Sequence, residues 1–114
     1  MRVLVCGGRD YRNAEKVFDT LDKIHAKTPV SILIEGGALG ADQSAAIWAD
    51  ARGVKRQRFV ADWAAFGKSA GPRRNQQMID QGRPELVVAF PGGRGTQDMV
   101  SRATLAKVQV EMIY

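Results

Sequence analysis

Five short apolar or alternating segments recur along the chain, and helical patterns separate them. Residues 2–6, 30–35 and 85–90 are almost continuously apolar, whereas residues 54–60 and 107–113 carry charged or polar side chains at alternate positions. Strands that alternate with helices form parallel βαβ units with right-handed crossovers. The pattern therefore predicts an α/β protein, a three-layer sandwich around a five-stranded parallel sheet.

The composition of each strand also predicts its place in the sheet. Strands covered on both faces are apolar throughout, so the first, second and fourth strands are expected at the centre. The third and fifth strands, with their charges, are expected at the edges. The familiar Rossmann-like order 3-2-1-4-5 satisfies this, with its switch point between strands one and four.

Capping residues predict where the helices begin and end. The first helix is expected to follow Asn13 as its N-cap, and the second to cover 41–52 and stop at Gly53. A third is expected to begin at Pro72, and a fourth after Thr96 as its N-cap. In that last helix, Met99 is followed at helical spacing by Ala103 and Ala106, which predicts that the methionine packs into the core.

The composition indicates one domain over residues 1–114, with 45% hydrophobic and 25% charged residues. No segment is long and apolar enough for a membrane span, and the first residues lead directly into a strand, so we expect a cytoplasmic protein without a membrane partner. Cys6 and His25 are the only residues of their types. We expect Cys6 to be a buried hydrophobe, and we expect no disulfide, no metal site and no cofactor.

A Gly-Gly pair follows each of the three central strands, in CGGRD at 6–10, EGGALGAD at 35–42 and PGGRGT at 91–96. In a parallel sheet these turns lie together at the carboxyl edge, where α/β folds bind ligands. Glycine lets a ligand approach the backbone, and the free N–H groups that open a helix attract anions. One such pair is explained equally well by a tight turn, but three at one edge favour a phosphate site. Neither the dinucleotide fingerprint nor the P-loop pattern fits these turns.

The long loop at 61–75 adds aromatic and basic side chains. Trp63 and Phe66 are suited to stacking on a base, or alternatively to covering the core. Arg73 and Arg74 stand in the first turn of the predicted helix, where cations oppose the helix dipole, so an anion that they bind would explain them. We expect Arg74 and Asn75 to contact the ligand; the alternative is a solvated surface charge.

The net charge of +5 raises the question of a nucleic-acid partner. The candidate site loops hold five basic and five acidic residues: Arg9, Lys68, Arg73, Arg74 and Arg94 against Asp10, Glu35, Asp42, Asp62 and Asp98. This balance suits a compact ligand with a phosphate and ribose hydroxyls better than a DNA groove, which would be one-sidedly basic. A nucleic acid would then bind to another face of the protein. The residues that best support such binding are Lys55, Arg56 and Arg58. The sequence leaves a homo-oligomer open.

Several motifs together resemble the SLOG superfamily, which includes the Lonely-guy phosphoribohydrolases and the Smf and DprA DNA-processing proteins. The matching segments are GGRDY at 7–11, EGGALGAD with AAIWA at 35–49, ADW at 61–63, AGPRRNQQM at 70–78 and VAFPGGRGTQDM at 88–99. They occur in the right order over nearly the whole chain, and they are most similar to the YspA-type, YpsA-related branch.

The resemblance implies a site for a nucleotide-derived ligand, with Gly92, Gly93, Gly95 and Thr96 around a phosphate. In the Lonely-guy enzymes the motif PGGxGTxxE ends in a glutamate used to cleave the N-glycosidic bond, and here Met99 stands in that position. The leading hypothesis is therefore a nucleotide-binding module that acts as a sensor or a processing protein. The first alternative is an N-glycosidic hydrolase of nucleoside 5′-monophosphates, with Glu35, Asp42, Asp62 or Asp98 as the catalytic carboxylate; the second is a DNA-binding protein.

The predicted ligand-binding residues come from all of these loops. They are Gly7, Gly8, Arg9, Asp10, Gly36, Gly37, Asp42, Asp62, Trp63, Arg74, Asn75, Pro91, Gly92, Gly93, Gly95 and Thr96.

Overall fold

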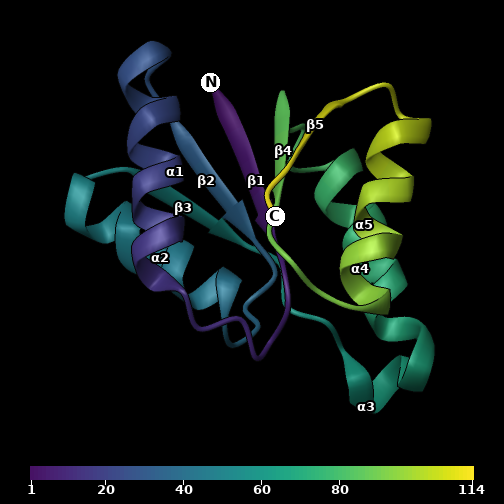
Figure 1. Cartoon of the computed structure of the whole chain (residues 1–114). Helices are drawn as coiled ribbons and strands as arrows, with labels where there is room; N and C mark the ends of the chain where they lie inside the picture. The colour runs from purple at the N-terminus through teal and green to yellow at the C-terminus, as the bar shows by residue number, and fades with distance from the viewer.

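The computed structural model describes residues 1–114 and contains one five-stranded sheet in the order β3-β2-β1-β4-β5 (Figure 1). The strands are β1 (Arg2–Cys6), β2 (Ile32–Glu35), β3 (Lys55–Arg58), β4 (Leu86–Ala89) and β5 (Gln109–Met112). Every neighbouring pair of strands is parallel. The structure thus confirms the predicted Rossmann-like α/β fold, including the strand order and the two charged edge strands.

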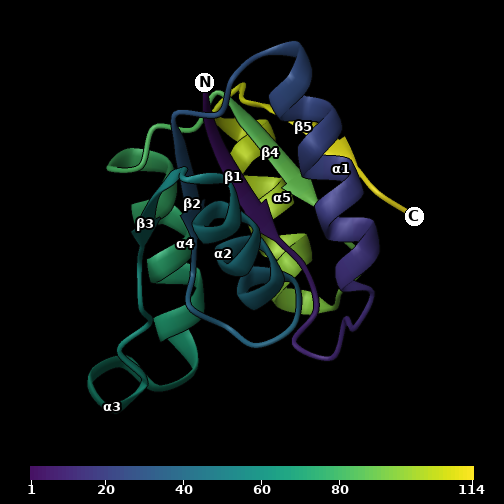
Figure 2. The same ribbon diagram turned by 90° about the vertical axis from the view of Figure 1, so that its left-hand side faces the viewer.

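Helices cover both faces of the sheet (Figures 1 and 2). One layer is formed by α1 (Ala14–Lys27) and α2 (Ala41–Arg52), and the other by α4 (Ala70–Asp80) and α5 (Arg94–Leu105). Between β3 and α4 the chain forms the short helix α3 (Trp63–Phe66) and the 3₁₀ turn η1 (Gly67–Ser69). None of the helices could cross a membrane, because each is too short or too polar.

The core has one part on each face of the sheet. Val3 and Val5 of β1 pack with α1 and α2 around the fully buried Trp48, whereas Leu4 packs with α4 and α5 on the other face. Successive side chains of a strand point to opposite faces, so a central strand must be apolar at every position. Met99 lies in the second part of the core with 1% of its surface exposed, which confirms its predicted packing role.

Two of the predicted helix ends are confirmed. The side chain of Asn13 accepts a hydrogen bond from the Lys16 N–H at 3.0 Å and caps α1. α2 ends at Gly53, which adopts the left-handed conformation with φ of 69°. Glycine reaches this conformation without steric cost, so the helix can stop sharply there.

Two predicted helix starts are wrong. α4 begins at Ala70, two residues before Pro72, because η1 leads into it without a break. α5 begins at Arg94 with Gly93 as its N-cap, so Thr96 lies inside the first turn and does not cap the helix. The Thr96 side chain is buried and fills the space that a Cβ on Gly92 would need.

The end of α5 also differs from the prediction. The helix stops at Leu105, so Ala106 lies beyond it and is exposed, and only Ala103 joins Met99 in the core.

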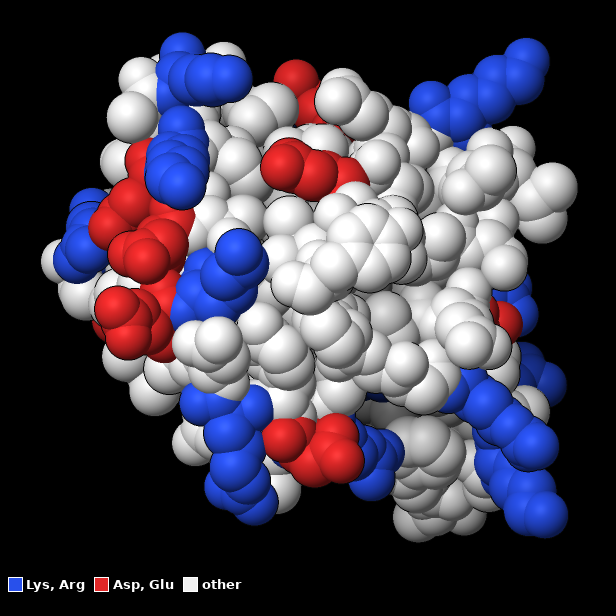
Figure 3. Space-filling view, viewed as in Figure 1, with Lys and Arg blue, Asp and Glu red and all other residues white.

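The charged side chains are mixed in sign on the face shown in Figure 3. Lysines and arginines stand beside aspartates and glutamates along the left side of this view, where Figure 1 places α1. The centre of the view is largely free of charge. On the left side and at the centre of this view, the positive charges therefore form no continuous basic surface.

Candidate functional site

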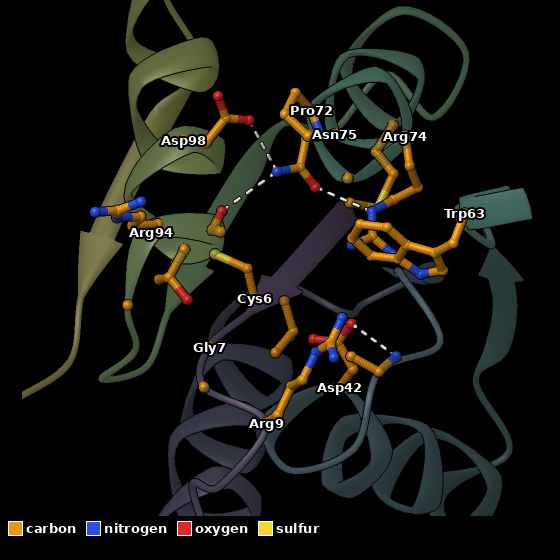
Figure 4. A pocket seen from close by; sticks show the side chains of 18 of the residues that line it. Cys6, Gly7, Arg9, Asp42, Trp63, Pro72, Arg74, Asn75, Arg94 and Asp98 are labelled. Carbon is orange, nitrogen blue, oxygen red and sulfur yellow. Dashed lines mark hydrogen bonds between the residues drawn. The ribbon is translucent and has the colours of Figure 1, made fainter. Parts of the chain in front are cut away.

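A pocket of about 500 Å³ opens at the carboxyl edge of the sheet, where the turns after β1, β2 and β4 meet the start of α4 (Figure 4). Eleven of the residues singled out from the sequence line it: Gly7, Gly8, Arg9, Asp42, Trp63, Arg74, Asn75, Gly93, Gly95, Thr96 and Asp98. Seven others lie outside the lining: Asp10, Glu35, Gly36, Gly37, Asp62, Pro91 and Gly92.

The pocket also contains residues that sequence reasoning did not single out as ligand contacts. Lys68 and Arg94 had entered only the charge count, and Ala38, Gly71, Pro72 and Met78 had no role in the predicted site. Ala38 belongs to the motif at 35–42 and the last three to the motif at 70–78. For these four residues, the only signal in the sequence was therefore their place within the recognised motifs.

The first glycine turn, after β1, holds the other two together. The Gly8 N–H donates to the Pro91 carbonyl at 2.9 Å, and the Gly8 carbonyl accepts from the Ala41 N–H at 3.3 Å. A Cβ on Gly7 would collide with Ala41, and a Cβ on Gly40 would collide with the Gly8 carbonyl. The glycines at these contacts are explained by the close packing of one turn on the next.

The second turn, after β2, is fixed by buried charged side chains. The Asp42 Oδ2 accepts hydrogen bonds from the N–H groups of Gly36 at 3.0 Å and Ala38 at 3.4 Å. The fully buried Glu35 pairs with Arg58 at 2.7 Å and also accepts from the Gly37 N–H. The Glu35 carboxylate therefore stabilises the junction between β2 and β3 and lies outside the pocket.

The third turn, after β4, differs from the other two. A Cβ built on Gly93 or Gly95 meets no atom within 4 Å, and neither residue has a positive φ. The backbone N–H groups of Arg94, Gly95 and Thr96 have no acceptor within the chain. These groups open α5, where the helix dipole is positive, and they lie at the pocket. This turn therefore exposes backbone N–H donors that no side chain covers, an arrangement that suits an anion.

Arg74 is a half-buried cation without an acidic partner. Its Nε donates to the Asn75 Oδ1 at 3.0 Å, and its Nη1 donates to the Gly36 carbonyl. No carboxylate lies within 4.0 Å of the guanidinium, and burial lowers the pKa of Arg74. Its Nη2 has no partner in the chain, so the side chain is held in place with free donors at the pocket.

The neighbouring Arg73 has a different environment. Its guanidinium lies 4.4 Å from the centre of the Phe66 ring and its Nε donates to the Ser69 hydroxyl at 3.2 Å, both on the surface. Neither Arg73 nor Phe66 lines the pocket. Of the two consecutive arginines, only Arg74 faces the site.

Asn75 connects the two sides of the pocket (Figure 4). Its Oδ1 accepts from Arg74, while its Nδ2 donates to Asp98 at 3.0 Å and to the Gly95 carbonyl at 3.3 Å. Asp98 also accepts from Arg102 at 2.8 Å. Partial burial opposes the ionisation of Asp98, but the bonds from Arg102 and Asn75 outweigh it and hold the pKa below its usual range. Asp98 is thus an ionised structural acceptor.

Asp42 is the other carboxylate of the pocket, and it is almost completely buried. Burial raises the pKa of Asp42 to about 6, and the nearby Glu35 adds to the rise, while the backbone bonds from Ala38 and Gly36 and the charge of Arg74 oppose it. Burial also raises the pKa of the adjacent Cys6 thiol to about 12, with a further contribution from Asp42. Cys6 is consequently a protonated thiol and a poor nucleophile.

Trp63 stands at the edge of the pocket on α3, with 48% of its surface exposed. The Arg9 guanidinium lies 5.6 Å from the centre of the indole ring. Asp62, directly before it, accepts from the Ala65 N–H at 3.0 Å and caps α3. An exposed indole beside a polar pocket offers a stacking surface, whereas Asp62 serves the short helix that presents it.

The charges that line the pocket are less balanced than those of the candidate site loops, which hold five basic and five acidic residues. Four cations line it, Arg9, Lys68, Arg74 and Arg94, against the two carboxylates of Asp42 and Asp98. None of the four makes an ion pair within the chain. The pocket is therefore electropositive, which suits an anionic ligand. No group of three or more His, Cys, Asp or Glu side chains is placed to hold a metal ion.

The basic side chains of β3 are mostly engaged within the chain. Arg56 pairs with Asp50 at 2.9 Å, and Arg58 pairs with Glu35. Lys55 makes no such pair. This strand therefore offers a nucleic acid fewer free cations than its sequence suggests.

Comparison with known proteins identifies the family. Residues 1–66 match YAcAr, the YspA, cpYpsA-related SLOG family. The Gene 61 protein of Mycobacterium phage D29 is 35% identical over 119 aligned positions, which cover 96% of this chain and 93% of the phage protein. With the Rossmann-like strand order and the glycine turns at its carboxyl edge, these matches lead to one conclusion: the chain belongs to the YspA, cpYpsA-related SLOG family.

Proposed function

We propose that this protein binds a phosphorylated nucleoside, with the phosphate on the turn of residues 93–96. The observation that carries the proposal is the open space at Gly93 and Gly95 beside three unpaired N–H groups. The neighbouring atoms of the protein do not require glycine at either position, since an added Cβ would meet none of them. A ligand that must approach the backbone closely would require it, because a Cβ would stand between the phosphate and its donors.

The rest of the pocket supports the same ligand. Arg94 and Trp63 lie on opposite sides in Figure 4, so a phosphate beside Arg94 leaves room for a base to stack on the indole. Arg74 and Arg9 supply further positive charge between them. Membership of a SLOG family suggests a nucleotide-related ligand, and the pocket of about 500 Å³ is within the range that binds molecules of this size.

The proposal is tested by titrating the protein with the ribonucleoside 5′-monophosphates of adenine, guanine, cytosine and uracil, and with adenosine. Calorimetry and thermal denaturation are the measurements. At least one monophosphate is expected to bind and to raise the melting temperature, whereas adenosine, which lacks the phosphate, binds at least tenfold more weakly. No response to any phosphorylated nucleoside would overturn the proposal.

Gly95→Ala locates the phosphate on the turn. The added methyl group meets no protein atom, so the variant is expected to fold normally and to bind the nucleotide at least tenfold more weakly. Ser101→Ala is the matched control, because Ser101 is exposed on the same helix, makes no hydrogen bond through its side chain and does not line this pocket. Equal affinities for the Gly95→Ala variant and the wild type would place the phosphate elsewhere.

A second candidate is N-glycosidic hydrolysis of the bound nucleotide. It is favoured by the position of Asp42 at the pocket with a pKa raised to about 6, because perturbed carboxyl groups are typical of acid and base catalysts. Of the other carboxylates considered from the sequence, Glu35 and Asp62 lie outside the lining, and Asp98 is held by Asn75 and Arg102. Chromatographic analysis for free base after prolonged incubation with each monophosphate decides between binding and cleavage.

A further inference from the structure

The Asp42 carboxylate has one oxygen committed to the fold and one oxygen free. Oδ2 accepts the two N–H groups of Gly36 and Ala38, and no group of the chain donates to Oδ1. The side chain belongs to a residue with only 6% of its surface exposed. No buried side-chain nitrogen or oxygen in the structure lacks a hydrogen-bond partner, so Oδ1 must reach the solvent, and it does so at the pocket that Asp42 lines.

A free carboxylate oxygen at the pocket selects for a ligand with a hydrogen-bond donor. A carboxylate can only accept, and burying this one against an apolar or acceptor group would cost free energy. A phosphate monoester has no donor to offer when it is doubly ionised. The partner of Oδ1 is therefore a hydroxyl or amino group of the ligand.

The strand order places Asp42 beside the middle of the proposed ligand. Along the carboxyl edge, the turn after β2 that leads to Asp42 lies between the loop after β3, which carries Trp63, and the turn after β4, which carries Gly93 and Gly95. In a nucleotide whose phosphate lies on the β4 turn and whose base stacks on Trp63, the sugar occupies the space between. The donor that meets Asp42 is then a sugar hydroxyl.

We infer that Asp42 accepts a hydrogen bond from a ribose hydroxyl and makes the site selective for nucleotides that carry this hydroxyl over analogues that lack it. This inference rests on the proposed function, since it assigns a residue to the sugar of the bound nucleotide. Arg74, with its free Nη2 at the same pocket, adds donors for the ligand's oxygen atoms. The hydroxyl that Asp42 recognises is at the 2′ or the 3′ position, and both share the same chemistry.

The test compares AMP with 2′-deoxy-AMP and 3′-deoxy-AMP, with GMP and its deoxy analogues used in the same way if guanine is the preferred base. Loss of the recognised hydroxyl is expected to weaken binding about 10- to 100-fold, as removal of a hydrogen bond to a charged group does. The analogue that loses affinity identifies the hydroxyl. If all three bind equally well, the inference is wrong while the proposed function stands; if no nucleoside monophosphate of any base binds, the proposed function itself fails.

Asp42→Asn assigns the selectivity to this side chain. The amide oxygen can keep the bonds from Gly36 and Ala38, and the amide nitrogen then presents a donor to the pocket in place of an acceptor. The ratio of affinities for AMP and its deoxy analogue is expected to fall below about threefold, by the same loss of one charged acceptor. Asp98→Asn, at the other carboxylate of the pocket, is expected to leave the ratio unchanged. A ratio that falls in Asp98→Asn and persists in Asp42→Asn would overturn the assignment.

Two further measurements keep the test independent of how the variants fold. In the wild type, the carboxyl ¹³C resonance of Asp42 is expected to shift with AMP and to shift much less with the deoxy analogue that loses affinity. IMP, which lacks the exocyclic amino group of AMP, is expected to bind within about threefold of AMP, because no charged hydrogen bond to that group is lost. A large loss with IMP together with equal binding of the deoxy analogues would assign Asp42 to the base and refute the inference.

Discussion

The turn after β2 and the turn after β4 look alike in sequence but use their glycines for different purposes. In the first, Gly36 leaves room for the Arg74 side chain, and Gly37 and Gly40 have positive φ angles of 73° and 75°. In the second, Gly93 and Gly95 neither avoid a neighbouring atom nor have a positive φ. Gly92, the other glycine of the second turn, is still needed by the fold, because a Cβ there would meet Thr96. The comparison teaches that a single glycine at a ligand-binding edge can belong either to the fold or to the ligand, and that the surrounding space decides which.

The largest expected effect is at the turn after β2. Gly40→Ala is expected to destabilise the protein by about 3 kcal/mol or more, because the new Cβ would collide with the Gly8 carbonyl at a strained φ. Urea denaturation measures this loss. A change below about 1 kcal/mol would show that the two turns tolerate side chains equally and would remove the distinction.

The next effect separates the two consecutive arginines at the start of α4. Arg74→Ala is expected to weaken nucleotide binding about 100-fold, since it removes charged donors from the pocket and also the bond that holds the Gly36 carbonyl. Arg73→Ala is the matched control, because Arg73 stacks on Phe66 outside the pocket. Isothermal titration of both variants is decisive: comparable losses would show that the effect is one of overall charge.

Asp42 gives the turn after β2 a pH dependence. Its pKa of about 6 in the folded protein lies above the ordinary value of 3.8, so the stability that the protonated carboxyl contributes is present below pH 4 and is lost as the pH rises through 6. Asp42→Asn removes this ionisation. The free energy of unfolding of the variant, relative to that of the wild type, is expected to rise by about 2 kcal/mol from pH 4 to pH 8. Denaturation curves across this range measure the difference.

The charged groups around Asp42 influence the pH dependence that this experiment measures. Glu35 raises the pKa of Asp42 and Arg74 lowers it, while the Cys6 thiol stays protonated over the whole range. The same experiment on Asp62→Asn, a carboxylate outside the pocket, serves as the control. A stability difference between Asp42→Asn and the wild type that does not change with pH would contradict the burial of the charge.

The smallest effect is at the turn after β4. Gly95→Ala in the free protein is expected to raise the free energy of unfolding by up to about 1 kcal/mol, because alanine loses less backbone entropy than glycine in a helix. The Cβ meets nothing within 4 Å, so no steric cost offsets the gain. A rise in thermal stability together with weaker nucleotide binding is the signature of a glycine kept for the ligand. A destabilised variant would place Gly95 in the same class as Gly40.

The fold and the location of the site could be predicted from the sequence because both depend on local patterns. Continuous or alternating apolar residues distinguish central from edge strands, and the Gly-Gly pairs after β1, β2 and β4 had to meet at one edge once the strands were parallel. The predicted starts of α4 and α5 are wrong for two reasons: η1 leads directly into α4 ahead of Pro72, and the Thr96 side chain packs instead of capping α5. Thr96 is a good N-cap residue in isolation, but here its side chain fills the space beside Gly92.

By itself, the sequence determined the parallel sheet, its strand order and the edge at which the glycine turns gather. Only the tertiary structure decided which side chains face the pocket, because those contacts join residues that are far apart in the chain. Arg74 reaches the Gly36 carbonyl across 38 positions, and Arg58 holds Glu35 across 23. Such pairings depend on the space and partners that the packed elements leave, so five acidic residues in the loops became two carboxylates in the pocket. In both of them Oδ2 accepts hydrogen bonds within the chain and Oδ1 accepts none.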